Sequence, residues 1–170
     1  MRPRASSPQE IRTVKYKHVL AATDFSTLGD LALSRGAQLA ADSGAKLTAV
    51  HVLPEPDAPS PLFAHYEVTR DAGKLEAAKQ GAAAALEERI PADVKNADVE
   101  IDYRVVLGDP ATEILTLDVR LAPDLIVLAT HGRRGWQRWI MGSVAERVVQ
   151  MARADVLAVR ERDPVDLDEL

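Results

Sequence analysis

The chain has 170 residues, of which 46% are hydrophobic, and it carries a formal net charge of -5 at pH 7. This size and apolar content suit one compact domain with a sizeable core, whereas the acidic balance argues against a general nucleic-acid surface. The absence of cysteine excludes disulfides and thiolate chemistry, and it removes the usual ligands of a structural zinc site.

The two ends of the chain differ in composition from its middle. Residues 1–15 carry arginines, serines and prolines without an apolar core, which predicts a disordered tail rather than a secretory signal. Residues 161–170 read as an acidic tail, and one domain is expected over 16–160. The apolar runs are far shorter than the roughly 20 residues of a membrane-spanning helix. We therefore expect a cytoplasmic protein that binds neither membranes nor nucleic acids.

The first part of this domain is predicted to be strand, helix and strand. Apolar runs over 17–22 and 47–53 are typical of strands buried on both faces. Between them, Thr27 stands three residues before Asp30, as a helix-capping pair does, and Gly44 is expected to end the helix.

The middle of the chain repeats this alternation. Apolar residues at helical spacing from Leu75 to Ile90 predict a helix, and alternation over 99–107 predicts a strand with one wetter face, as at a sheet edge. Asp109 and Pro110 have the residue types of a helix cap and first turn. The next helix is expected to pack through Ile114, Leu115 and Val119.

The last part of the domain contains a buried strand over 125–129, a glycine-containing loop and another helix. Ser143 is predicted to cap that helix, and residues 156–159 form a last apolar strand. The helix is expected to pack through Val144, Val148, Val149 and Met151. This alternation predicts a parallel sheet with helices on both faces and ligands beyond the carboxyl ends of the strands.

The loop between the last two strands has the composition of an anion site. Gly132 and Gly135 free the backbone, and exposed amides at the helix start near Gly142 could face a phosphate. The alternative is that Gly135 only marks a turn and Ser143 only caps a helix. Spacing alone leaves both interpretations open.

The loop, with Thr130-His131-Gly132, nine residues and then Gly142-Ser143-Val144-Ala145-Glu146, resembles the universal stress protein family. That family has G-x2-G-x9-G followed by Ser or Thr, and the first glycine is replaced here by Ala129. The resemblance covers Tyr16 to Arg160, and three further motifs support it: Tyr16-Lys17-His18-Val19-Leu20 with Thr23-Asp24-Phe25-Ser26, Val50-His51-Val52, and Gly108-Asp109-Pro110.

The resemblance implies an α/β fold, Rossmann-like or similar to the adenine nucleotide α-hydrolases. Its open five-stranded parallel sheet would have the strand order 3-2-1-4-5 and helices on both faces. The reversal of strand order would place Thr23 and Asp24 opposite the loop from Ala129 to Ser143. The family also commonly dimerises through the last strand, so a homodimer through Val156–Val159 is expected. An uncovered apolar edge strand invites such pairing.

The resemblance also implies an ATP site, with Mg²⁺ or Mn²⁺ as an option. Ala22, Thr23 and Asp24 match the adenosine-binding turn, and Val52 matches a backbone contact to adenine. The loop positions expected to meet the phosphates are Ala129, Gly132, Gly142, Ser143, Val144 and Ala145. Asp24 has an alternative role as a helix cap. The four histidines show no metal-ligand spacing, so no metal-binding residue is predicted.

The same loop carries charged and aromatic side chains. Arg133, Arg134 and Arg138 would bring positive charge near the phosphates, although loop arginines are usually solvated. Trp136 and Trp139 are expected to pack or to meet a partner rather than to stack on the base.

Known catalytic motifs are missing. The sequence has no G-x4-G-K phosphate loop and no G-x-S-x-G nucleophile elbow, so no catalytic residue is predicted.

The leading hypothesis is an ATP-binding regulatory module of the stress response with little or no hydrolysis. A weak ATPase activity is an open alternative to the complete absence of hydrolysis. The alternative is a nucleotide-independent, dimeric interaction protein of the same fold. Ala129 favours this alternative, whereas the spacing from Gly132 to Ser143 favours ATP binding. If position 129 requires positive φ, alanine costs roughly 1–2 kcal/mol there.

Overall fold

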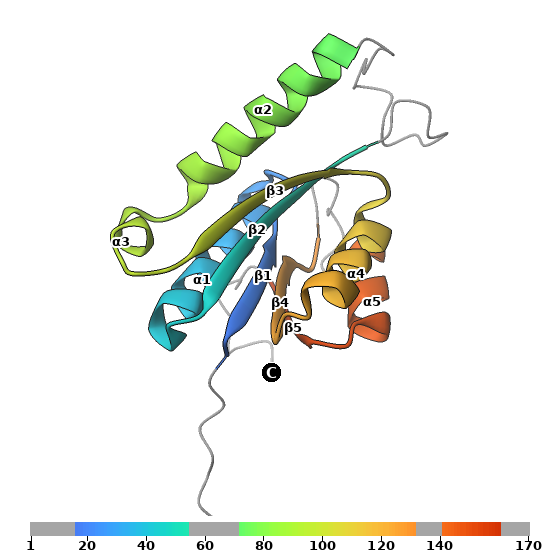
Figure 1. The fold of residues 1–170 in the computed structure, drawn as a ribbon. Helices are drawn as coiled ribbons and strands as arrows, with labels where there is room; N and C mark the ends of the chain where they lie inside the picture. The colour runs from blue at the N-terminus through green and yellow to red at the C-terminus, as the bar shows by residue number, and fades with distance from the viewer. Residues whose placement is uncertain (1–15, 55–71, 132–140, 161–170) are drawn as a thin grey trace, which may run out of the picture.

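The computed structural model describes residues 16–54, 72–131 and 141–160. Its centre is one five-stranded sheet in the order β3-β2-β1-β4-β5, and every neighbouring pair is parallel. Figure 1 shows the strands side by side. They are β1 (His18–Ala22), β2 (Lys46–Leu53), β3 (Ile101–Leu107), β4 (Leu125–Ala129) and β5 (Asp155–Val159). The expected sheet and strand order are confirmed, with β3 at one edge as its wetter pattern predicts.

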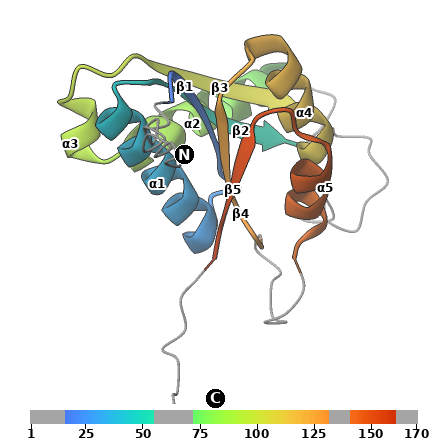
Figure 2. The same cartoon turned by 90° about the horizontal axis from the view of Figure 1, so that it is seen from below.

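Helices cover both faces of the sheet (Figures 1 and 2). One face packs against α1 (Thr27–Ser43), α2 (Ala72–Arg89) and the one-turn α3 (Ala92–Lys95), and the other against α4 (Pro110–Leu121) and α5 (Ser143–Met151). The sequence did not predict α3, which begins directly after Pro91. In the described segments, no helix combines the length and hydropathy needed to cross a bilayer.

Two hydrophobic cores explain the continuous apolar runs in the central strands. Along β1, Val19 and Ala21 face α1, whereas Leu20 and Ala22 face α4 and α5. All four side chains are buried, since successive residues of a strand point to opposite faces. The same alternation in β2 puts His51 and Val52 on opposite faces of the sheet.

The helix starts correct one of the predicted caps and confirm another. Ser26, not Thr27, caps α1, because its extended backbone lets its Oγ accept a hydrogen bond from the Gly29 amide at 3.0 Å. Asp109 caps α4 as predicted, accepting from the Thr112 amide at 3.0 Å. Its hydrogen bonds to the Thr112 hydroxyl and amide hold the pKa of Asp109 below its ordinary value.

The outer faces of α4 and α5 are more apolar than predicted. Val119, Val149 and Met151 were expected to pack, but 58%, 47% and 60% of their surfaces are exposed. Helical neighbours lie about 100° apart, so Val148 and Val149 cannot both face the sheet, and Val148 is the one buried. The buried apolar positions of these helices are Ala111, Ile114, Leu117, Ala145 and Val148, and Leu115 and Val144 pack partly buried against the same core, as predicted.

Candidate functional site

The candidate site lies where the strand order reverses. From β1 the chain crosses to β2 on one side, and β4 pairs with β1 on the other. Ala21 is paired with Val127, so the chain beyond β1 and the chain beyond β4 leave adjacent strands at the same level. The predicted turn at Thr23 and Asp24 and the start of the glycine loop therefore meet at one edge of the sheet.

Thr23 is fixed in the turn that follows β1. Its amide donates to the Val50 carbonyl at 3.0 Å, its hydroxyl donates to Asp30 Oδ1 at 3.2 Å, and that hydroxyl accepts from the Phe25 amide at 3.0 Å. The side chain is buried. Because these bonds use both the amide and the hydroxyl, Thr23 fixes the shape of the turn.

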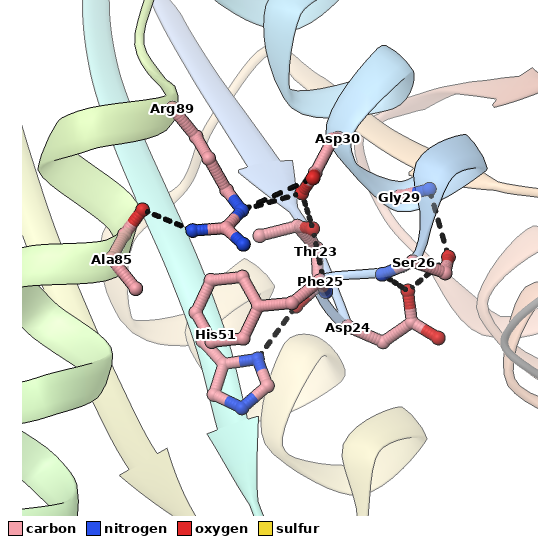
Figure 3. A network of polar contacts seen from close by, with 9 residues as sticks. All are labelled: Thr23, Asp24, Phe25, Ser26, Gly29, Asp30, His51, Ala85 and Arg89. Atoms are coloured by element: carbon pink, nitrogen blue, oxygen red, sulfur yellow. Dashed lines mark hydrogen bonds and ion pairs between the residues drawn. The ribbon is translucent and has the colours of Figure 1, made fainter.

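Asp24 supports the cap of α1 without being the cap. Its Oδ1 accepts from the Ser26 amide at 3.0 Å and from the Ser26 hydroxyl at 2.5 Å, and Ser26 in turn binds the Gly29 amide (Figure 3). The N-cap residue of α1 is therefore Ser26, and Asp24 does not have the capping role that was its alternative. The carboxylate is held beside the start of α1, at the edge where the two turns meet.

Gly29 is a site residue that the sequence analysis missed. A Cβ at this position would clash with Asp24 Oδ1 and would lie 2.9 Å from Thr23 Oγ1. Only glycine leaves room for both side chains. The sequence does carry a signal for it. Glycine has a low helix propensity, so a glycine in the first turn of a helix indicates that something other than helix formation, such as close packing, requires it.

Phe25 adopts a left-handed backbone with φ of 61°. For a residue other than glycine this conformation costs about 1–2 kcal/mol. The Phe25 ring stacks on the His51 ring, with centroids 4.0 Å apart. The guanidinium carbon of Arg89, a residue of α2, lies 4.6 Å from the centroid of the Phe25 ring (Figure 3). Packing on both neighbours helps to offset the strain. The left-handed residue redirects the chain from β1 into α1.

His51 connects β2 to the same turn. It is 8% exposed, and its Nδ1 lies 2.8 Å from the Thr23 carbonyl oxygen. A carbonyl oxygen only accepts, so Nδ1 carries the proton and donates it. A cavity of about 250 Å³ adjoins this contact, lined by Phe25, His51, Leu53, Pro54, Leu75, Ala78, Gly81, Ala82 and Ala85.

Val52 offers its backbone to the site. Along a strand, alternate residues direct their N–H and C=O groups to the same side. The Val50 carbonyl accepts from Thr23 on the β1 side, whereas the Leu53 carbonyl accepts from Gly108 on the β3 side. The Val52 backbone groups therefore point toward β1, beyond the residue at which β1 ends. This geometry suits a backbone contact to a planar base.

The start of α5 forms the opposite wall. Gly142 is its N-cap residue, and its amide donates to the Thr130 carbonyl at 2.7 Å. Gly142 has no side chain to cap this helix, whereas Ser26 and Asp109 cap α1 and α4 with theirs. The predicted cap at Ser143 is therefore wrong, because Ser143 is already the first helical residue. The first-turn amides, with Val144 and Ala145 among them, have the geometry that an anion requires.

Close packing explains the glycine at position 142. A Cβ there would lie 3.1 Å from the Thr130 carbonyl oxygen and 3.7 Å from the His131 Cα. A larger side chain would push the helix start away from the end of β4. Gly142 thus allows the start of α5 to pack closely against the chain that leaves β4.

Ala129 lies at the end of β4, where it pairs with Val159. Among the described residues other than glycine, only Phe25 and Ala122 have positive φ. Ala129 therefore carries none of the backbone strain that an alanine would have at positive φ. Its methyl group packs against the core on the α1 face.

Part of the predicted loop lies outside the described residues: Gly132, Gly135, Arg133, Arg134, Arg138, Trp136 and Trp139. Within residues 16–54, 72–131 and 141–160, no group of three or more His, Asp or Glu side chains could hold a metal ion. The positions that the structure brings to one edge are Ala22, Thr23, Asp24, Val52, Ala129, Gly142, Ser143, Val144 and Ala145.

Comparisons with known proteins agree with this geometry. A protein of Staphylococcus aureus (strain USA300) named as a universal stress protein is 32% identical over 155 residues, which cover 90% of each chain. The universal stress protein UspA from Lactobacillus plantarum has a similar fold, with a TM-score of 0.71, 23% identity, and coverage of 87% of this chain and 100% of that one.

A universal stress protein in complex with cAMP gives a TM-score of 0.58 and 26% identity, and the match covers 86% of this chain and 98% of that one. The model of the universal stress protein family matches residues 15–160. The chain therefore belongs to the universal stress protein family.

Proposed function

We propose that this protein is a regulatory module of the stress response that binds ATP and hydrolyses it little or not at all. The observation that carries the proposal is the start of α5, where the N-cap residue is a glycine whose amide is bonded to the Thr130 carbonyl at the end of β4, beside the Thr23–Asp24 turn. A related protein, 26% identical, has been crystallised with cAMP, which supports an adenine nucleotide as the ligand class.

In this proposal, each part of the site meets a different part of the nucleotide. The Val52 backbone contacts adenine, and the Thr23–Asp24 turn lies against the ribose. The phosphates lie at the Gly142 backbone, the Ser143 side chain and the amides of Val144 and Ala145, with Gly132 completing the loop. Where Mg²⁺ or Mn²⁺ accompanies the nucleotide, Asp24 is the carboxylate of the site that could contact it.

The absence of a phosphate-loop motif supports the low hydrolysis in this proposal. A phosphate-loop lysine would neutralise charge on the β- and γ-phosphates, and no such motif occurs in the chain. Binding without turnover suits a module whose liganded state is the signal.

Calorimetric titration with ATP tests the proposal. We expect saturable heat at millimolar ATP and no phosphate release above the buffer rate. Gly142→Leu should abolish the heat, because the side chain would meet the Thr130 carbonyl. Ser143→Ala keeps all the amides and should weaken binding only a few-fold.

Two results would contradict the proposal. A wild-type protein without saturable heat for ATP, AMP or cAMP would not be an adenine-nucleotide module. An unchanged titration in Gly142→Leu, with thermal unfolding also unchanged, would place the ligand elsewhere.

The second candidate function, a nucleotide-independent dimeric interaction protein, is favoured by the partly exposed edge strand β5, where Leu157 is 37% exposed.

A further inference from the structure

The last turn of α2 reaches the turn that follows β1. Arg89 Nε lies 3.0 Å from Asp30 Oδ1 and 3.1 Å from Asp30 Oδ2, and its Nη1 donates to the Ala85 carbonyl at 3.0 Å. Figure 3 shows the guanidinium between α2 and the start of α1. Two residues 59 positions apart in the chain are thereby joined.

The contact continues into the turn through hydrogen bonds. Asp30 Oδ1 accepts from the Thr23 hydroxyl at 3.2 Å, and that hydroxyl accepts from the Phe25 amide at 3.0 Å. A continuous chain of polar contacts therefore runs from the Arg89 guanidinium through Asp30 and the Thr23 hydroxyl to the Phe25 amide.

A second route from Arg89 reaches the same place through the rings. The guanidinium carbon lies 4.6 Å from the centroid of Phe25, whose ring stacks on His51, and His51 donates to the Thr23 carbonyl. The left-handed Phe25 is thus in contact with both Arg89 and His51. Both routes converge on Thr23, one at its hydroxyl and the other at its carbonyl oxygen.

We propose that Arg89 is a positioning residue of the nucleotide site: it holds the Thr23–Asp24 turn in the shape that binds the nucleoside, without touching the ligand. This inference rests on the function proposed above. Arginine suits the task because its planar fork can donate to Asp30 and to Ala85 while one face covers a ring. Lysine, a compact point charge, cannot make all three contacts.

A purely structural role would give a different result. Arg89 and Asp30 side chains are 32% and 35% exposed, and an ion pair at such a surface contributes little to global stability. If Arg89 acts only as a surface ion pair, its removal should change neither the affinity for ATP nor the local order of the turn. If it positions the turn, both should change.

Arg104 provides a matched control. It pairs with Asp102 through Nε at 2.7 Å, with side chains 40% and 29% exposed, and it lies on the edge strand β3. The experiment compares Arg89→Ala, Arg89→Lys and Arg104→Ala in two measurements. One is the dissociation constant for ATP, and the other is hydrogen exchange of the Phe25 and Gly29 amides, which are bonded within the turn.

We expect Arg89→Ala to raise the dissociation constant about tenfold, which is the size of a typical coupling between two sites. Arg89→Lys should raise it by less. Exchange at Phe25 and Gly29 should accelerate in Arg89→Ala, whereas Arg104→Ala should behave like the wild type in both measurements. An unchanged dissociation constant in Arg89→Ala, with a wild type that binds ATP, would overturn the inference and leave the proposed function intact.

A wild type that binds no adenine nucleotide would overturn the proposed function instead. The exchange measurement then still decides whether Arg89 holds the turn. Unchanged exchange in Arg89→Ala would overturn that part, and faster exchange confined to the turn would support it.

Discussion

The effect of replacing Ala129 by glycine depends on the backbone conformation at that position. The residue is the last of β4 and pairs with Val159, and its φ lies outside the positive range that favours glycine. Ala129→Gly therefore relieves no backbone strain. We expect the dissociation constant for ATP to change by less than about threefold, and the free energy of unfolding to fall by about 0.5–1 kcal/mol, because glycine is costly inside a strand. Titration and urea unfolding measure the two quantities.

Ala49→Gly is a suitable control, since Ala49 is buried in β2 and should lose stability without any effect on binding. A glycine variant of Ala129 that binds ATP tenfold more tightly would show that the methyl group itself obstructs the ligand.

At the scale of elements, the same substitution should have opposite effects in two helices. Gly29 lies in the first turn of α1 against Asp24 and Thr23, whereas a Cβ at Gly81 in α2 would meet nothing within 4 Å. We expect Gly29→Ala to lower the free energy of unfolding by about 1–3 kcal/mol through overpacking. Gly81→Ala should raise it by about 0.5–1 kcal/mol, because alanine has the higher helix propensity.

Urea unfolding of the two variants gives both numbers. Gly29→Ala should also weaken ATP binding, because the Asp24 carboxylate must move. Equal stabilisation by both substitutions would mean that the turn yields to a methyl group at no cost.

Elements were predictable from the sequence where one local rule applied. Asp109 was recognised as a cap because Pro110 marks the first helical position beside it. Ser26 and Thr27 are adjacent hydroxyl residues, and only the backbone of Ser26 decides which of them caps α1. The strands follow from apolar runs, but their order came from the family resemblance, because periodicity does not determine which strands are neighbours. The Arg89–Asp30 pair spans 59 residues and leaves no local pattern.

At the scale of the whole molecule, the expected homodimer would use the outer edge of β5. The Val159 carbonyl accepts from the Thr130 amide and the Asp155 amide donates to Asp124, so odd-numbered residues face β4. The Ala158 amide consequently points away from the sheet. Ala158→Pro should remove an outward donor, leave the ladder to β4 in place and convert a dimer to a monomer in light scattering.

Ala158→Val keeps the amide and should leave the oligomeric state unchanged. A wild type that scatters as a monomer, or a dimer that survives the proline, would contradict an interface through Val156–Val159.

The central position of β1 affects how the protein is made. β1 is an early strand, yet one of its two neighbours is β4, and Ala22 and Ala129 are about a hundred residues apart in the chain. At roughly 5–20 residues per second, the ribosome needs about 5–20 s to make that distance. Throughout this interval the edge of β1 that later pairs with Leu125–Val127 has no partner strand. For those seconds, the strand that becomes the centre of the sheet is an edge strand, with unpaired backbone donors and acceptors on the side that β4 later covers.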